Sequence, residues 1–170
     1  MGPKKAKSAH AVALELLNRR ALSEDELRQK LLKRGFGSKE VEEELTRLRR
    51  LGLVSDLELA RMVVRTKLGS GHGPWALRAS LRQRGIAPKV GEQVLAELAP
   101  EDEVEAMSRA LEKALRRFEN EEASHRRQKV VRYLLSRGFG LSAALRATEF
   151  LGGELDEDAL VEPGAPDEIP

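Results

Sequence analysis

The sequence predicts an all-α protein of three tandem three-helix, helix-turn-helix-like repeats that form an elongated, curved array. Composition is the first reason. The 170 residues are 41% hydrophobic and 34% charged but only 4% aromatic, which is typical of helices with charged outer faces and unlike an aromatic-rich sheet. The second reason is a short segment that occurs three times at nearly equal spacing, the signature of a repeat architecture.

The repeated segment is an apolar pair at i and i+4, followed by Arg, Gly and another apolar residue. Its copies cover residues 27–36, 77–86 and 130–139, and their glycines are separated by 50 and 53 residues. A helix ends in this way, because Gly accepts the left-handed conformation after the last turn and the next apolar residue folds back on the helix. We expect the Arg before each Gly to lie beside the negative end of the helix.

The first repeat is expected to span 10–54, after a basic arm over 1–9. Ala11, Leu14 and Leu17 give its first helix an apolar stripe, and the segment from Ser23 to Glu26 has the pattern of a capping box that opens the second helix.

The third helix of this repeat is expected to start at Ser38. Its apolar positions recur with helical spacing at Val41, Leu45, Leu48 and Leu51. Its early acids are interpreted as a solvated face: Glu40, Glu42, Glu43 and Glu44.

The second repeat is expected to span 55–99 and the third 100–152. Ser55 and Asp56 open the first helix of repeat two, residues 69–73 interrupt the helices, and Pro74 restarts them at a first helical position. A further helix begins near Pro88. The third repeat has a long first helix with Val104, Met107, Leu111, Leu115 and Phe118 as its stripe, a polar break over 119–124 and a last helix over about 141–151.

Charge is distributed unevenly along the chain. Residues 153–170 contain seven acids and no Lys or Arg, whereas residues 1–152 contain all 30 Lys and Arg and the other 21 acids, a formal net charge of +9. A basic body favours contact with a polyanion, and the acidic segment over 153–170 is predicted to be a disordered tail.

Several classes of function have no support in the sequence. The chain has no Cys, and its three His are more than fifty residues apart, so neither a metal site nor a thiol nucleophile is predicted. Residues 69–73 are Gly-rich but lack the Lys and the preceding strand of a phosphate loop. No catalytic residue and no cofactor is predicted. No apolar run approaches the roughly 18 residues of a membrane span, and we expect a cytoplasmic protein.

Basic side chains at helical spacing are the candidate contacts to a partner or to DNA. They could neutralise phosphates but read no sequence by themselves. The candidates are Arg61, Arg65, Lys67, Arg78, Arg82, Arg126, Arg127, Lys129 and Arg132. Stacking on unpaired bases requires exposed aromatic rings, and only Trp75 and Tyr133 are candidates, with Trp75 interpreted first as a packing anchor.

An ordered set of short motifs resembles the RecX family of regulators of the RecA recombinase. The resemblance covers about 10–152 and is strongest over 20–98. It begins with Arg20-Ala-Leu-Ser23-x-x-Glu26-Leu27-x-x-Lys30-Leu31-x-x-Arg34-Gly35 and continues with Leu51-Gly52-Leu53-Val54-Ser55-Asp56, Ala60, Gly69, Gly73, Leu77, Leu81 and Arg84-Gly85-Ile86. The residues expected to have structural roles in this pattern are Glu26, Leu27, Leu31, Gly35, Asp56, Gly73, Leu77, Leu81 and Gly85. The chain departs from the family at Leu53 and Leu59, where aromatic residues are frequent, and its third repeat matches loosely.

The resemblance implies a non-enzymatic monomer without a cofactor. Such a protein lies along the groove of the RecA filament on single-stranded DNA, binds duplex DNA more weakly, and restrains ATP hydrolysis, strand exchange and promotion of repressor self-cleavage. Two alternatives stay open at this point. One is a helix-turn-helix-like regulator of duplex DNA, against which the acidic start of the helix at Ser38 counts; the other is an enzyme whose site the sequence does not reveal.

Overall fold

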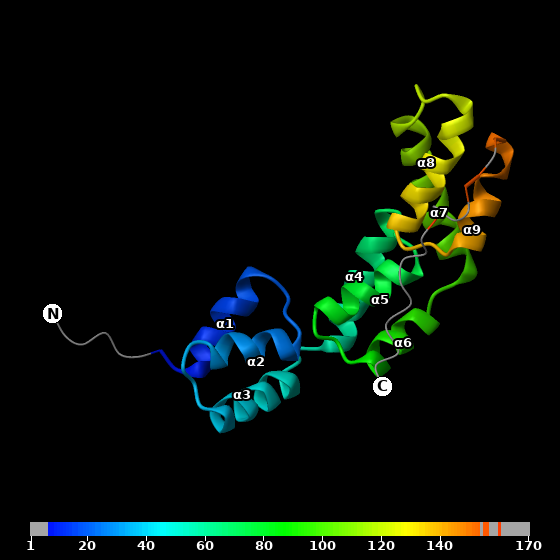
Figure 1. Ribbon diagram of the computed structural model, residues 1–170. Helices are drawn as coiled ribbons and strands as arrows, with labels where there is room; N and C mark the ends of the chain where they lie inside the picture. Colours follow the sequence, from blue (N-terminus) through cyan, green and yellow to red (C-terminus); the bar gives the residue numbers. More distant parts are fainter. Residues whose placement is uncertain (1–6, 154, 157–159, 161–170) are drawn as a thin grey trace, which may run out of the picture. The chain divides into compact units, whose positions relative to one another are not determined.

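The computed structural model describes residues 7–153, 155–156 and 160, without the side chains of residues 123 and 124 (Figure 1). All regular elements in this part of the chain are helices, as predicted. Most of the predicted acidic tail and most of the basic arm lie outside the described residues. None of the described helices is long and apolar enough to cross a membrane.

The helices follow one another in groups of three. In the first repeat they are α1 (Ala9–Arg19), α2 (Glu24–Leu32) and α3 (Ser38–Arg50); in the second, α4 (Asp56–Gly69), α5 (Pro74–Gln83) and α6 (Pro88–Ala96). In the third they are α7 (Pro100–Arg117), α8 (Ala123–Ser136) and α9 (Leu141–Ala147), followed by the 3-10 turn η1 (Glu149–Leu151). The structure therefore confirms the all-helical fold with its starts at Ser38, Asp56, Pro74 and Pro88, whereas the elongation and curvature of the array stay predictions.

The described chain forms two compact units. The first contains the described residues up to Met62 together with Leu81–Ala96, and the second contains Val63–Ser80 together with the described residues from Glu97 onward. The division falls within α4 and α5, so both units take part of the second repeat. The repeat boundaries expected at residues 54/55 and 99/100 remain predictions.

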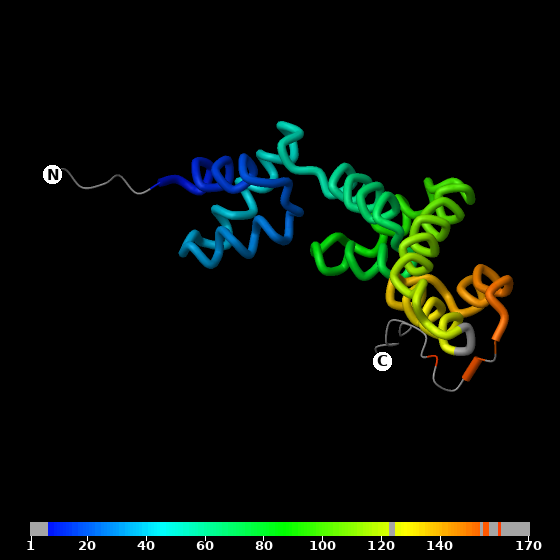
Figure 2. The backbone as a smooth tube through the Cα atoms, turned by 90° about the horizontal axis from the view of Figure 1, so that it is seen from above, coloured from blue at the N-terminus to red at the C-terminus, as the bar shows by residue number. Residues whose placement is uncertain are grey.

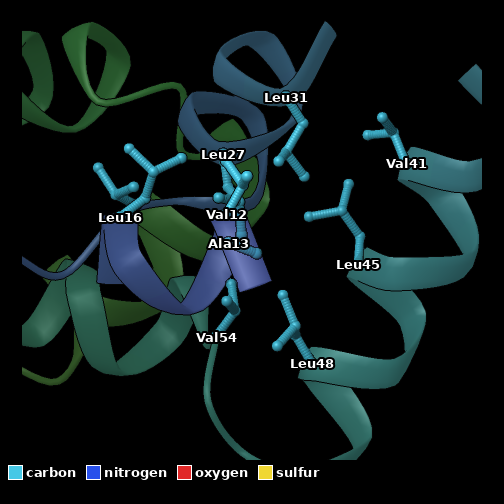
Figure 3. Close-up of a cluster of buried hydrophobic side chains, with 10 residues drawn as sticks. Val12, Ala13, Leu16, Leu27, Leu31, Val41, Leu45, Leu48 and Val54 are labelled. Carbon is cyan, nitrogen blue, oxygen red and sulfur yellow. The ribbon is translucent and has the colours of Figure 1, made fainter. Parts of the chain in front are cut away.

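In the first unit α1, α2 and α3 pack against one another around a leucine-rich core, and Figure 3 shows their side chains pointing toward a common centre. The core contains Val12, Ala13, Leu16, Leu22, Leu27, Leu31, Val41, Leu45, Leu48 and Val54. Burial of each large aliphatic side chain contributes about 1.5–3 kcal/mol. This core is the main source of stability in the first repeat.

Two expectations for this repeat are wrong. The buried residues of α1 are Ala9, Val12, Ala13 and Leu16, whereas Leu14 is 38% exposed. Because α1 is apolar around most of its circumference, spacing alone could not select the inward face. The acids of α3 do not all lie in solvent either. Glu44 is buried and its Oε1 is 2.7 Å from His10 Nδ1. A hydrogen bond with His10 therefore replaces the contact of this carboxylate with water.

The predicted helix ends are confirmed in atomic detail. Ser23 and Glu26 form a reciprocal capping box at the start of α2. At the three Arg-Gly segments, the N–H groups of Phe36, Ile86 and Phe139 donate to the carbonyls five residues earlier, and each Gly has a positive φ. This is the Schellman arrangement, which satisfies carbonyls that the helix leaves without partners.

The family-pattern residues of the first unit hold neighbouring segments together. Asp56 Oδ1 accepts from the N–H of Glu24 at 2.9 Å, which links the start of α4 to the start of α2. Burial raises the pKa of Asp56 above its usual value, although the Glu24 N–H opposes this effect. Glu26 accepts from Arg84, the Arg of the second Arg-Gly segment, and Leu27 and Leu31 are fully buried. Leu81 is buried as well, and its side chain lies next to Gly91 of α6.

In the second unit α8 packs against α7 and α9, and the three helices lie together in both views (Figures 1 and 2). The apolar stripe expected for α7 is wrong in its composition. Its buried residues are the alanines Ala106, Ala110 and Ala114, while Val104 is exposed. Small side chains are needed here because the turn at Gly71 lies directly on the α7 backbone. A Cβ on Gly71 would be 3.0 Å from Ala110 N.

Candidate nucleic-acid interface

The second unit has a basic hollow beside α8, with a volume of about 540 Å³. One face of α8 provides most of its lining, at i, i+3, i+4, i+7 and i+8: Lys129, Arg132, Tyr133, Ser136 and Arg137, the last of which caps the helix. Arg117 and Phe118 from the end of α7 and His72 from the turn before α5 complete it. No carboxylate of the described part of the chain belongs to this lining.

The two faces of α8 explain why these side chains point outward together. Val130, Val131, Leu134 and Leu135 are all buried, and this apolar face fixes the rotation of the helix against α7 and α9. The positions between them then necessarily form a polar face. The basic hollow is thus set by the same periodicity that builds the core.

Arg137 is held in place from two directions. Its guanidinium carbon lies 4.8 Å from the centroid of the Tyr133 ring, a cation–π contact. Its Nη1 lies 3.3 Å from His72 Nε2, while His72 Nδ1 lies 3.3 Å from the carbonyl oxygen of Lys67. The neutral imidazole with its proton on Nδ1 satisfies both bonds, because it donates to the carbonyl and accepts from the guanidinium.

The electrostatics around His72 favour this neutral form. Burial lowers the pKa of His72 below its usual value, and the positive charges of Lys67, Arg137 and Lys113 lower it further, whereas the hydrogen bond to the Lys67 carbonyl opposes this effect. His72 is thus a neutral support for Arg137 at physiological pH. The same positive surroundings favour an anionic ligand.

Phe118 and Tyr133 form the aromatic side of the hollow. Their rings meet edge to face, with centroids 6.4 Å apart, and the Arg117 guanidinium carbon lies 5.6 Å from the Phe118 centroid. The two rings therefore lie next to each other, with the Arg117 guanidinium against one and the Arg137 guanidinium against the other. This combination provides both flat apolar surface and positive charge.

Close packing of backbone holds His72 beside α8. Gly73 N donates to Arg137 O at 2.8 Å and Trp75 N donates to Gly138 O at 3.0 Å, so carbonyls just after α8 accept from N–H groups around the start of α5. Gly138 permits this approach, because a Cβ there would be 2.3 Å from Ala76 N. Gly73 and Gly138 therefore have a structural role, because their close approach places His72 beside Arg137.

Of the predicted basic contacts, the structure brings only Lys129 and Arg132 into this hollow. Arg126 and Arg127 are on α8 but point elsewhere: their guanidinium groups donate to Leu115 O and to Gly153 O. Both are partly buried, and their Nε atoms have no hydrogen-bond partner among the described residues. These two arginines are therefore less accessible to a ligand than their spacing suggested.

The candidate residues of the second repeat are dispersed over α4 and α5. Arg61 pairs with Glu58 at 2.7 Å, Arg65 and Arg82 are exposed, and Lys67 and Arg78 are half-buried. Leu77, on the inward side of α5, is buried. Trp75 is half-buried, which agrees with its interpretation as a packing residue.

Sequence reasoning missed five residues of the hollow. Arg137 was interpreted only as a helix-end residue, and His72, Arg117, Phe118 and Ser136 had no assigned binding role. The successive i+4 steps from Lys129 to Tyr133 and from Tyr133 to Arg137 were a usable signal, because they place all three on one helix face. His72 could not have been found, because it is 65 residues from Arg137 in the chain.

The described structure is that of a helical repeat protein with a basic, partly aromatic hollow. The sequence matches three family models in order: "RecX, first three-helix domain" over 9–48, "RecX, second three-helix domain" over 55–95 and "RecX, third three-helix domain" over 101–147. The chain belongs to the RecX family of regulatory proteins.

Individual relatives agree with this assignment. A regulatory protein RecX of Thermus thermophilus is 41% identical over 139 residues, which cover 82% of this chain and 89% of that protein. Another, from Pelodictyon phaeoclathratiforme, is 33% identical over 157 residues, with 89% and 96% coverage. The crystal structure of RecX from Lactobacillus salivarius has a TM-score of 0.73 at 23% identity over 84% of this chain and 94% of that one, a likeness of fold.

Proposed function

We propose that this protein binds the RecA recombinase filament on single-stranded DNA and thereby inhibits its ATPase, strand-exchange and coprotease activities. It acts in the cytoplasm as a monomer, without catalysis of its own. The observation that carries this proposal is the ordered match to all three RecX domains. Two relatives that are each 41% identical bear the name of regulatory protein RecX.

The charge of the chain supports a filament of protein and DNA as the target. Residues 1–152 carry a net charge of +9, which provides long-range attraction to phosphates. The hollow beside α8 concentrates part of this charge next to aromatic rings. Among the described residues, no group of three or more His, Asp or Glu could hold a metal ion.

A binding experiment tests this proposal directly. The full chain, labelled with a fluorophore, is titrated with RecA filaments formed on single-stranded DNA, and separately with RecA alone, bare single-stranded DNA and duplex DNA at the same salt concentration. We expect the tightest binding to the filament. Binding to duplex DNA that is at least as tight would contradict the proposal and support a helix-turn-helix-like regulator of duplex DNA.

A further inference from the structure

The basic hollow beside α8 combines three properties: a concave shape, a cationic lining and an aromatic ring pair. It is a shallow depression that is open to solvent, with a volume of about 540 Å³. Its lining contains four cations and no carboxylate of the described chain. It also contains the edge-to-face ring pair of Phe118 and Tyr133.

Most of its positive charge is not neutralised internally. Lys129 pairs with Glu121 at 2.6 Å, but Arg117, Arg132 and Arg137 have no ion-pair partner among the residues that the structure describes. Arg137 is in addition fixed by Tyr133 and His72. A guanidinium that is oriented before the ligand arrives, and whose donors face no carboxylate, is suited to a phosphate group.

We propose that this hollow is a binding site for one nucleotide unit with an unpaired base, whose phosphate contacts Arg132 and Arg137. The base lies against the aromatic pair of Tyr133 and Phe118. Charge alone would suit any anion, but a bare phosphate needs no ring and a paired base exposes no face to stack on. The rings therefore select an unpaired base among phosphate-bearing ligands.

The nucleotide unit comes either from a single strand of DNA or from a free nucleotide, because both present the same phosphate and base. In the first case the hollow gives the proposed contact with single-stranded DNA a specific place, and this part of the inference rests on the proposed function. The site itself is independent of RecA, so its test uses no recombinase. A negative result of this nucleotide-binding test would leave the outcome of the filament-binding experiment unaffected.

The test measures anisotropy of a short fluorescein-labelled oligothymidylate during titration with the full chain at low salt. Tyr133→Leu removes the ring and keeps an apolar side chain, Tyr133→Phe keeps the ring, and Arg132→Gln removes one exposed cation. The matched control is Arg109→Gln, which removes an exposed arginine of α7 that pairs with Glu105 and lies outside the hollow. Arg132→Gln and Arg109→Gln change the net charge equally.

We expect Tyr133→Leu to weaken oligonucleotide binding about fivefold or more, since one base stack contributes on the order of 1–3 kcal/mol. Tyr133→Phe should bind like the natural chain. Arg132→Gln should weaken binding and lower the slope of log affinity against log salt by about 0.7, the share of one phosphate contact to a single strand. Arg109→Gln should change the affinity less than about twofold, because an exposed charge outside the site acts only through weak, screened attraction.

Competition distinguishes the two sources. Displacement by the mononucleotide dTMP at a concentration similar to that of nucleotide units in the oligomer identifies a free-nucleotide site. Displacement only by the oligomer identifies a strand segment, and both results support the proposal. It is overturned if Tyr133→Leu has no larger effect than Arg109→Gln, or if an oligoglutamate of equal charge displaces the oligomer equally well, which would indicate an acidic peptide as the ligand.

Discussion

Arg84 and Glu26 form a two-point ion pair across 58 residues of sequence. Arg84 Nε donates to Glu26 Oε1 at 3.0 Å and Nη2 donates to Oε2 at 3.1 Å, and Nη2 also donates to the carbonyl of Ala21 at 2.8 Å. Their side chains are 25% and 17% exposed. The arginine of the second Arg-Gly segment thus binds the capping carboxylate of α2, whereas the equivalent Arg34 donates to Lys30 O in its own helix.

Glu26→Gln should lower the free energy of unfolding by about 2 kcal/mol. The substitution keeps the shape and the acceptor for the Ser23 N–H, but it removes the charge from hydrogen bonds that typically contribute on the order of 1.5–3 kcal/mol. Urea denaturation measures the effect. Glu112→Gln is the control, because its pair with Arg116 is 63% and 78% exposed and should contribute less than about 0.5 kcal/mol; equal effects of the two variants would contradict the prediction.

The same pair has a defined pH dependence. Burial alone would raise the pKa of Glu26, but hydrogen bonds from Arg84, Arg20 and Ser23 outweigh it and hold the pKa below its usual value. The stabilising contribution of Glu26 is therefore complete above the unfolded-state pKa and is lost as the pH falls through the lower folded-state pKa.

Gly138→Ala should destabilise the protein much more than Gly35→Ala. Both glycines end a helix with nearly the same positive φ, 85° and 87°, which costs an alanine about 1 kcal/mol. Only at Gly138 would the new Cβ lie 2.3 Å from Ala76 N; nothing lies within 4 Å at Gly35. We expect losses of about 1 kcal/mol for Gly35→Ala and about 3 kcal/mol or more for Gly138→Ala. Equal losses in chemical denaturation would show that the close approach is not needed.

Acidification below pH 6.5 should destabilise the chain through His72. Its folded-state pKa is lowered by burial and by Lys67, Arg137 and Lys113 from the usual 6.5, so the unfolded chain takes up the proton first. The contribution of neutral His72 is complete above the unfolded-state pKa and is lost as the pH falls from there through the folded-state pKa. The unfolding free energy is measured at about pH 7.5 and about pH 5.5, on either side of the ordinary histidine pKa. His72→Gln should lose less stability between these values than the natural chain, and an identical loss would be inconsistent with this role.

The arginines of the second repeat are predicted to contact DNA phosphates or acidic recombinase surface. Replacement of Arg61, Arg65, Arg78 and Arg82 with Ala should raise the concentration for half-maximal inhibition of RecA about tenfold, on the order of 1.4 kcal/mol. The control replaces four exposed arginines elsewhere, Arg19, Arg34, Arg109 and Arg116, and removes the same charge. Unchanged inhibition by the first variant rules out this surface.

What could be predicted from the sequence is mainly local. The capping box at Ser23 and the helix ends at Gly35, Gly85 and Gly138 were predictable because their hydrogen bonds join residues five or fewer positions apart. The family resemblance added the order of the repeats. Helix starts at Pro74 and Pro88 followed from the fixed φ of proline.

The errors have a common physical origin in packing between distant segments. Hydrophobicity suggested large side chains as the buried stripe of α7, but the turn at Gly71 lies so close that alanines occupy it. The partner of Arg84 was not predictable, because a guanidinium near a helix end can serve its own carbonyls or a carboxylate far along the chain. For the same reason the sequence revealed Lys129 and Arg132 but not that Arg137 and His72 join them.

The central claim, that this chain regulates RecA, is tested most directly by the hydrolysis of ATP by RecA on single-stranded DNA, titrated with the full chain. Binding to the same DNA without RecA is measured in parallel. We predict inhibition at amounts of protein too small to cover the DNA, because the proposed target is the filament and not the bare strand. Undiminished hydrolysis while the chain binds DNA tightly would contradict the claim.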